Sequence, residues 1–258
     1  MSFFPQTGNG VIAQFPFRRT RHWRAITNQV ESGELISLPD LGGGEVGWTL
    51  KYDDLSSSES QAISELFSAS QGQFGSFTFV DPMANLLGWS EDLSQANWQT
   101  LQLGITAGMT DPLGTTKASQ VSNSGPGTLA LSQTLGISGD YVACFSVYVQ
   151  AASSTTISLQ RDSLQNILKA SPQWSRLMLS GTGTAGAAQS TFSLNLTAGQ
   201  TVNIFGLQVE AQPCPSAYKP TAAASGIYEE TYFADGRLTV TSTAPGLSRA
   251  SINLISRT

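Results

Sequence analysis

The sequence predicts an all-β protein with one short helix, in which a β-rich domain is interrupted by an antiparallel β-sandwich of the jelly-roll kind. The 258 residues are 40% apolar but only 12% charged, and Gly, Ser and Thr are abundant, as in strand-and-turn proteins. Segments with an apolar residue at every second position recur along the chain. In the middle, "ANLLGWSEDLSQANW" reads as the start of a new domain directly after the strand "GQFGSFTFVDP".

The first part of the chain predicts a strand, a helix and a second strand. The segment "EVGWTLKY" places four apolar side chains on one face of a half-buried strand, namely Val46, Trp48, Leu50 and Tyr52. Ser56 and Glu59 then have the spacing of a capping box, and the helix that follows is expected to stop at Gly72. The segment "QFGSFTFVDP" alternates again and ends at Pro82, which cannot donate to a ladder.

Both ends of this first unit carry further signals. Upstream, "GELISLPDLGGGE" predicts a short apolar stretch that ends at Pro39, followed by a glycine run acting as a mobile loop or hinge. Near the C-terminus, Leu238 and Val240, and then Ile252 and Leu254, alternate with polar residues around an Ala-Pro-Gly turn. Such a hairpin is only marginally stable alone, so we expect it to complete the N-terminal sheet.

The sequence pattern changes in the middle of the chain, between the N-terminal segment and the C-terminal hairpin. Short alternating segments such as "DYVACFSVYVQA", "TTISLQRD", "QWSRLMLSGT", "STFSLNLTAGQ" and "TVNIFGLQVEA" follow one another with glycine-rich turns between them. Regular short strands without a helical pattern are typical of a sandwich or jelly roll. We therefore expect three parts: residues 1–85, an insert of residues 86–220, and closing strands in residues 221–258. A host sheet loses little by carrying a module whose two ends lie close together.

Composition also excludes some classes of function. The net charge of −5 gives no overall attraction to nucleic acid or to an anionic membrane. No stretch approaches a membrane span, and the first twenty residues lack the order of a secretion signal, so we expect a protein made and folded in the cytosol without membrane insertion. Cys144 and Cys214 are expected to be free thiols, with a bridge between them as the other possibility.

Two parts of the chain resemble known families. The outer segments resemble the ring-forming domain of distal tail proteins, the minor tail proteins of long-tailed phages and gene-transfer particles; the matching segments are "GWTLKYDDL", "SESQAISELFSASQG", "GQFGSFTFVDP" and "RLTVTSTAPGLSRASINLI". The middle resembles the jelly-roll modules, similar to carbohydrate-binding modules, that recur in phage structural proteins. The matching segments there are "NLLGWSEDLSQANWQ", "QWSRLMLSG" and above all "VNIFGLQVEAQPCPSAYKPT".

The resemblance implies a virion structural protein of the tail tip, made in the host cytoplasm. It implies a homo-oligomeric ring, a hexamer, between the tail tube protein and the tail hub protein, with the jelly-roll insert projecting outward toward host cell-surface carbohydrate. DNA would pass only as cargo, and an acidic channel suits its sliding because like charge repels phosphate. The alternative is a glycan-binding adhesion protein in which the ring-like half is only a mount.

The densest run of charge consists of Arg18, Arg19, Arg21 and Arg24, with Trp23 among them. The run is brief, its surroundings are acidic and no aromatic platform accompanies it, which argues against a phosphate clamp. Two interpretations remain: a solvated edge strand, or ion pairs with acidic residues of a neighbouring copy. Under the tail-protein resemblance the four arginines are candidates for a subunit contact.

Aromatic residues of the insert are candidates for glycan contact. Sugar-binding modules stack sugar rings on exposed aromatic faces, and Trp98, Trp89 and Tyr148 have the required chemistry. A buried position in the sandwich core is the commoner fate of such residues and stays open as the alternative, above all for Trp174 in "QWSRL".

No residue pattern points to catalysis, so we expect no enzyme, no catalytic residue and no cofactor. The sole histidine, His22, lies far from any nucleophile motif, and the adjacent Glu91 and Asp92 point to opposite faces of a strand. A glycoside hydrolase would need paired carboxylates. A structural calcium ion in the insert stays possible, with Asp92, Asp111 and Glu210 as oxygen donors.

Overall fold

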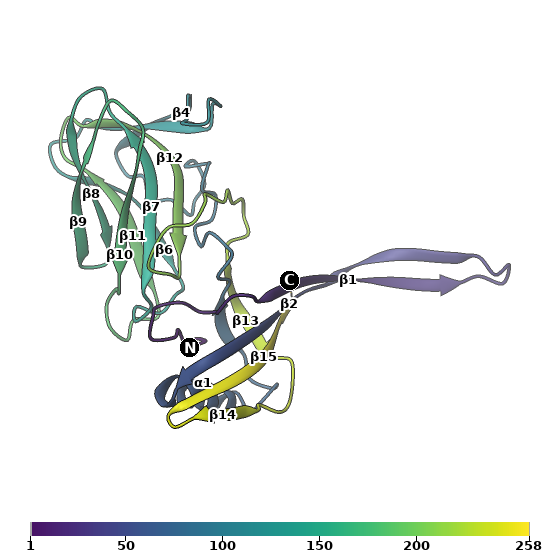
Figure 1. The fold of residues 1–258 in the computed structure, drawn as a ribbon. Coiled ribbons are helices and arrows are strands. Elements are labelled where there is room, and N and C mark those ends of the chain that lie inside the picture. The colour runs from purple at the N-terminus through teal and green to yellow at the C-terminus, as the bar shows by residue number, and fades with distance from the viewer. Residues whose placement is uncertain (1, 258) are drawn as a thin grey trace. The chain divides into compact units, whose positions relative to one another are not determined.

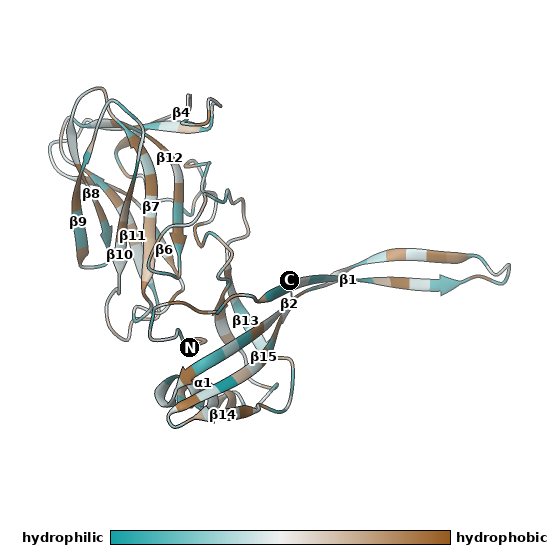
Figure 2. Cartoon of the chain, in the orientation of Figure 1, coloured by the Kyte–Doolittle hydropathy of each residue, from teal (hydrophilic) through white to brown (hydrophobic). Residues whose placement is uncertain are grey.

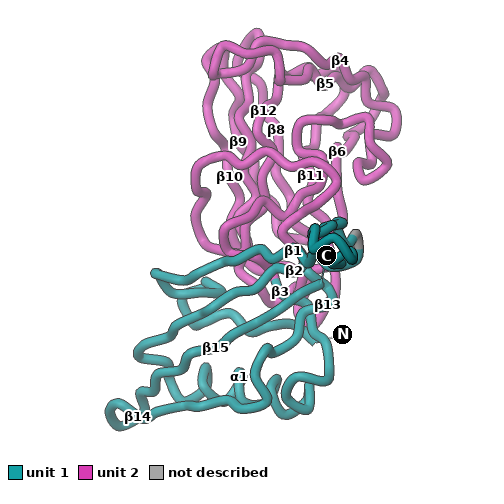
Figure 3. The backbone as a smooth tube through the Cα atoms, turned by 90° about the vertical axis from the view of Figure 1, so that its right-hand side faces the viewer, with its two compact units in different colours: residues 1–79, 228–258 teal, residues 80–227 magenta. Residues whose placement is uncertain are grey.

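The computed structural model describes residues 2–257 and divides the chain into two compact units (Figures 1 and 3). Unit 1 consists of residues 1–79 and 228–258, and unit 2 of residues 80–227. The ends of unit 2 lie a few residues outside the ends expected for the insert, residues 86 and 220. Within residues 2–257 no helix has the length and hydropathy of a membrane span.

Unit 1 contains a six-stranded sheet. Five of its strands have the order β1-β2-β15-β13-β3, and the sixth, β14, also pairs with β15. The strands are β1 (Arg18–Gln29), β2 (Leu35–Ser56), β3 (Phe77–Val80), β13 (Ile227–Phe233), β14 (Val240–Ala244) and β15 (Leu247–Arg257), and the helix is α1 (Ser57–Ala69). The N-terminal and C-terminal segments thus share one sheet, because β15 pairs antiparallel with β2 along most of its length.

The core of unit 1 follows the predicted alternation. Trp48 is 1% exposed, and its ring packs against Phe79 and Tyr228 at centroid distances of 4.8 and 4.7 Å. From β15, Ile252 and Leu254 are also buried. Three strands, β13, β14 and β15, lie beyond residue 226.

Helix α1 begins as the capping box predicts. The backbone N–H of Glu59 donates to Ser56 Oγ at 3.3 Å, and Ser56 N–H donates to Glu59 Oε2 at 2.7 Å. The chain leaves the helix through Gly72, whose φ of +68° is a left-handed conformation that favours glycine. Ile63 and Leu66 are the buried residues of the helix.

The expectation of a mobile loop or hinge in "LPDLGGGE" is wrong. These residues belong to β2, a strand of 22 residues that runs on through Pro39 and the glycines. Pro39 pairs with Ala25 of β1, and in this stretch β2 has β1 as its neighbour on one side only, so a residue without an N–H is tolerated. The pairing shifts register between Trp23 and Ala25, and the glycines lie opposite this irregularity.

Unit 2 is a β-sandwich of two antiparallel sheets, which confirms the predicted fold class (Figure 1). One sheet has the order β10-β7-β12-β5-β4 and the other β6-β11-β8-β9. Their bounds are β4 (Leu103–Met109), β5 (Ala118–Asn123), β6 (Leu129–Leu135), β7 (Ala143–Gln150), β8 (Thr155–Arg161), β9 (Leu164–Ala170), β10 (Ser175–Gly181), β11 (Ser190–Leu196) and β12 (Thr201–Glu210). The two sheets meet where Phe145 of β7 packs on Phe192 of β11, at 5.9 Å between ring centroids.

The two ends of unit 2 lie side by side. The backbone N–H of Asp81 donates to Gly226 O at 2.8 Å, and Trp89 N–H donates to Ala222 O at the same distance. The Asn85 side chain joins both ends, since its Nδ2 donates to Leu207 O at 2.9 Å and to Lys219 O at 3.1 Å. Adjacent ends are the geometry that lets a domain sit within a loop of another domain.

A buried arginine organises one end of the sandwich. Arg161 is 1% exposed, and its Nη1 donates to Tyr141 O and to Gly181 O, both at 2.6 Å. Its Nη2 donates to Ser138 O at 3.1 Å, and the guanidinium lies over the Phe192 ring. Burial lowers the pKa of Arg161 to about 10, so the side chain stays charged at neutral pH.

Candidate functional site

The first candidate site is a two-stranded ribbon in unit 1, which we call the arm and define as residues 23–44 (Figure 1). Within it β1 and the first part of β2 pair only with each other, from Ala25 opposite Pro39 to Gln29 opposite Leu35. The tip closes through hydrogen bonds from Val30 N to Glu34 O and from Gly33 N to Val30 O, at 2.9 and 2.8 Å.

The arm exposes apolar side chains on one of its faces. Residues directly opposite in a ladder share a face, and the face changes with every residue along the strand. Ile26 opposite Leu38, together with Ile36 opposite Asn28, therefore forms an apolar face. These three apolar side chains are 49%, 53% and 45% exposed, and Figure 2 shows hydrophobic residues on both strands of the arm.

The four predicted contact arginines lie on β1, where the arm leaves the sheet. All four are exposed. Arg24 forms an ion pair with Asp40 across the arm, with Nε 2.6 Å from Oδ2. Trp23 beside it is 73% exposed. The sole histidine, His22, is likewise exposed on this strand.

The second candidate site is a row of side-chain amides on the five-stranded sheet of unit 2. Gln120 of β5 donates through Nε2 to Asn203 Oδ1 of β12 at 3.4 Å, and Asn203 Nδ2 donates to Gln150 Oε1 of β7 at 3.3 Å. The row ends where Gln150 Nε2 donates to Pro172 O at 3.0 Å. The three amides border a hollow of about 300 Å³, which Thr201 also lines.

This row can recognise a ligand rich in hydroxyl groups. A side-chain amide offers two N–H donors and an acceptor oxygen with two lone pairs, and the hydrogen bonds along the row use only part of that capacity. All three amides are half-buried, so they are held in place and still reach solvent. The arrangement carries no net charge, which suits an uncharged polar ligand better than an ion.

Tyr148 borders the amide row. It lies two residues before Gln150 on β7 and therefore on the same face of the sheet. The Arg176 guanidinium lies over the Tyr148 ring at 5.3 Å from its centroid, and the Phe205 ring lies 6.0 Å away. One ring face is thus taken by a cation–π contact, and the half-buried phenol is the one aromatic candidate that the structure brings close to the row.

Trp98 is buried, which corrects its candidacy for glycan contact. Its side chain is 5% exposed, and its indole N–H donates to Trp89 O at 3.0 Å. A sugar ring needs an open aromatic face, and packing covers that of Trp98. Trp89 is half-buried in the opening turn of unit 2 with a φ of 52°, and Trp174 is half-buried before β10. Among the described residues, the lining of the amide hollow includes neither Trp89 nor Trp98.

The three carboxylates considered for calcium all accept structural hydrogen bonds. Asp111 is buried and accepts from the backbone N–H groups of Leu113 and Thr115, and Asp92 accepts from Ser94. Among residues 2–257 no group of three or more His, Cys, Asp or Glu side chains is placed to hold a metal ion.

Glu210 fastens the closing segment of unit 2 to β12. It is 1% exposed and accepts hydrogen bonds from Ser216, Gln208 and Lys219, with Lys219 Nζ at 3.0 Å. Burial alone would raise the pKa of Glu210, but the hydrogen bonds from Ser216, Gln208 and Lys219 outweigh it, so the pKa lies below its ordinary value.

The two cysteines are free thiols. Cys144 is buried on β7, and Cys214 is exposed in the closing segment. Burial raises the pKa of Cys144 to about 12, which leaves it unreactive at neutral pH.

No family model matches the chain, and no curated protein matches it. Solved structures that resemble it include the xylan-binding domain from CBM 22, at 14% identity and a TM-score of 0.39, with 53% of this chain and 98% of that chain covered. Another is TmCBM61 in complex with β-1,4-galactotriose, at 12% identity and a TM-score of 0.35, covering 48% of this chain and 97% of that chain. A third is the enzymatically active domain of tailspike protein 4 from bacteriophage CBA120, at 14% identity and a TM-score of 0.40, covering 51% of this chain but only 22% of that chain.

Proposed function

We propose that this chain is a structural subunit that assembles with copies of itself into a ring, and that the ring joins the tail tube to the hub at the tip of a phage-like tail. The single observation that carries the assembly role is the arm, with its apolar face open to solvent. The place in a tail tip, the hexameric copy number, the virion location and the tube and hub partners rest on the sequence resemblance to distal tail proteins.

The arm supports assembly because it is poorly stabilised alone. A two-stranded hairpin is marginally stable in water, and an exposed apolar strand pair is a ready template for another chain. A neighbouring copy that covers the apolar face would stabilise the arm and would also leave no exposed template for other chains. The proposal takes the contact of the arm to join two different surfaces, and repetition of such a contact closes a ring or extends a filament.

The charge of the chain is consistent with a ring through which DNA passes. A net charge of −5 per copy adds up around a ring and repels phosphate, so DNA slides without being held. Tight DNA binding by the assembled protein at physiological salt would contradict this part of the proposal.

The test is the mass and the negative-stain image of the full chain beside a variant in which residues 25–39 are replaced by a two-residue Asn-Gly turn. We expect closed rings from the full chain and monomers from the shortened one. Rings of equal stability from both proteins would show that the arm has no role in assembly. A full chain that stays monomeric at high concentration would overturn the assembly role.

The second candidate function is glycan binding by unit 2, and the amide row with its hollow of about 300 Å³ favours it. In the ring it would serve attachment to host carbohydrate; without a ring, the chain would be an adhesion protein. A glycan array separates these outcomes from a purely architectural unit. We expect Asn203→Ala to abolish binding of any glycan that the wild type retains, and Asn166→Ala, a half-buried amide on β9 outside the row, to leave it unchanged.

The proposal assigns the chain no catalytic step and no cofactor. In unit 2 the carboxylates of Glu210 and Asp111 accept structural hydrogen bonds. Release of reducing ends from host polysaccharide by the purified protein would contradict this assignment.

A further inference from the structure

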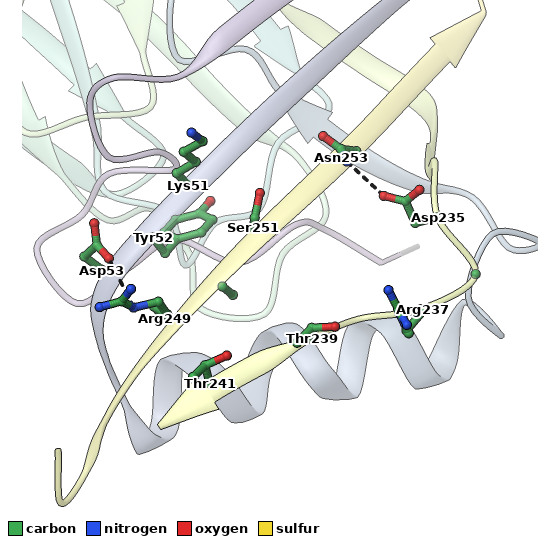
Figure 4. Close-up of a pocket in the computed structure, with 12 residues that line it drawn as sticks. Lys51, Tyr52, Asp53, Asp235, Arg237, Thr239, Thr241, Arg249, Ser251 and Asn253 are labelled. Atoms are coloured by element: carbon green, nitrogen blue, oxygen red, sulfur yellow. Dashed lines mark hydrogen bonds and ion pairs between the residues drawn. The ribbon is translucent and has the colours of Figure 1, made fainter. Parts of the chain in front are cut away.

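A hollow of unit 1 lies beside β15, where the sheet has a gap (Figure 4). Strand β13 pairs with the end of β15, from Leu254 to Ser256, and β14 pairs with its start, from Leu247 to Ala250. Ala234 N–H still donates to Asn253 O of β15 at 2.8 Å, and the strand pairing resumes only at Val240. The resulting hollow has a volume of about 730 Å³, within the range of ligand pockets.

Three cations and two carboxylates line this hollow. Asp235 accepts a hydrogen bond from Asn253 Nδ2 at 2.9 Å, and Asp53 lies 3.8 Å from Arg249. Lys51 and Arg237 are exposed, and within the described residues neither has a carboxylate at ion-pair distance. Two positive charges are therefore available at the hollow for a negatively charged partner.

The tip of the arm has the complementary charge. Glu31 and Glu34 lie within the tip turn, both exposed, and no lysine or arginine occurs between Arg24 and Lys51. The turn is compact, since two backbone hydrogen bonds close it around Gly33 at a φ of +85°. A narrow acidic turn at the end of a ribbon is a shape that can enter a polar hollow in a sheet.

The tip and the hollow lie at opposite ends of the same strand. The tip directly precedes Leu35, the first residue of β2, and Lys51, which lines the hollow, lies 16 residues further along the same strand. At 3.2–3.4 Å per residue this separation is roughly 50 Å. Figure 1 shows the arm leaving the sheet at one end and β14 lying at the other. A tip can therefore reach the hollow of another copy but never its own.

We propose that the acidic tip of the arm in one copy seats in the hollow of unit 1 in the next copy, with Glu31 and Glu34 facing Lys51 and Arg237. This inference rests on the proposed assembly role and names the receiving surface for the arm. The contact is head-to-tail, so each copy gives one tip and receives one, which is the arrangement that a closed ring requires.

The test reverses charge on each side in the full chain and measures association by sedimentation velocity over a concentration series. E31K/E34K and K51E/R237E should each weaken association about 10-fold or more, because two exposed ion pairs are replaced by repulsion. A single chain that carries all four substitutions should recover association, since the charges again match. K117E/K169E, two exposed cations of unit 2, is the control with the same change in net charge as K51E/R237E and should associate like the wild type.

The outcomes separate this inference from the assembly role. A wild type that associates while all charge variants associate equally well overturns the seating of the tip and leaves the assembly role intact. If each reversal weakens association but the fourfold variant does not recover, the tip has another partner, and the inference is wrong. Recovery of E31K/E34K by R18E/R21E instead would assign the tip to the arginines of β1. A wild type that stays monomeric removes both proposals.

Discussion

Removing the apolar face of the arm should weaken assembly by about two orders of magnitude. The change is Ile26, Ile36 and Leu38 to Thr, which keeps the β-branched preference for strands. Complete burial of such a side chain is worth about 1.5–3 kcal/mol. Because these side chains remain about half exposed, a neighbour that covers them adds about 1 kcal/mol each, or about 3 kcal/mol in total. At about 1.4 kcal/mol per factor of ten, the dissociation constant should rise about 100-fold.

The assay is again sedimentation velocity over a concentration series, with the midpoint of assembly as the readout. The control replaces three apolar residues of unit 2 that are even more exposed, Leu101, Leu113 and Ile167, with Thr. The control should assemble at the wild-type midpoint. Equal midpoints for the arm variant and the wild type would refute the reasoning, because an uncovered apolar face cannot drive association.

Three further predictions concern the stability of each unit. Arg161→Met removes the hydrogen bonds that Arg161 donates to the carbonyls of Tyr141 and Gly181, so the free energy of unfolding of unit 2 in urea should fall by about 3 kcal/mol, whereas the exposed Lys169→Met should change little. The pKa of Glu210 is lowered from 4.5 by folding, so its stabilisation is complete above that value and is lost as the pH falls below it; thermal melts from pH 6 to pH 3 should show a smaller decline for Glu210→Gln than for the wild type. Ser56→Ala removes the acceptor of the capping box and should cost unit 1 about 1 kcal/mol in urea unfolding, and a loss within error would mean that the cap adds nothing.

Much of the fold could be predicted because local patterns and burial agree. The alternation through Val46, Trp48, Leu50 and Tyr52 predicted the buried face of β2, since one face of that strand is covered and the other is not. Ser56 and Glu59 predicted the start of α1, because a capping box needs only two residues three positions apart.

The arm was missed because its signals contradict one another. Pro39 and the glycines after it are typical of a loop, yet a ribbon with one free side tolerates both, and β2 continues through them. The strands β4, β5, β6 and β9 also escaped prediction. β4 contains Gly104 and Gly108 and is largely exposed, so it lacks the apolar alternation that identifies a strand.

The amide row could not be predicted from the sequence at all. Gln120, Gln150 and Asn203 come from three strands that are far apart in the chain, and only the register of those strands brings them together. The chemistry of each residue alone is unremarkable, so no local signal marks it. Trp98, in contrast, was a candidate for glycan contact because it is aromatic. Its burial, which prevents that contact, depends on the surrounding fold.

The central claim is that unit 1 carries assembly and that unit 2 is an appendage. The most direct measurement is negative-stain imaging of the full chain beside a variant in which residues 86–220 are replaced by a short Gly-Ser linker. The linker can be short because Asp81 and Gly226 are joined by a backbone hydrogen bond of 2.8 Å. The account predicts rings of the same copy number from both proteins. Rings from the full chain with monomers from the shortened one, still folded in unit 1, would contradict it.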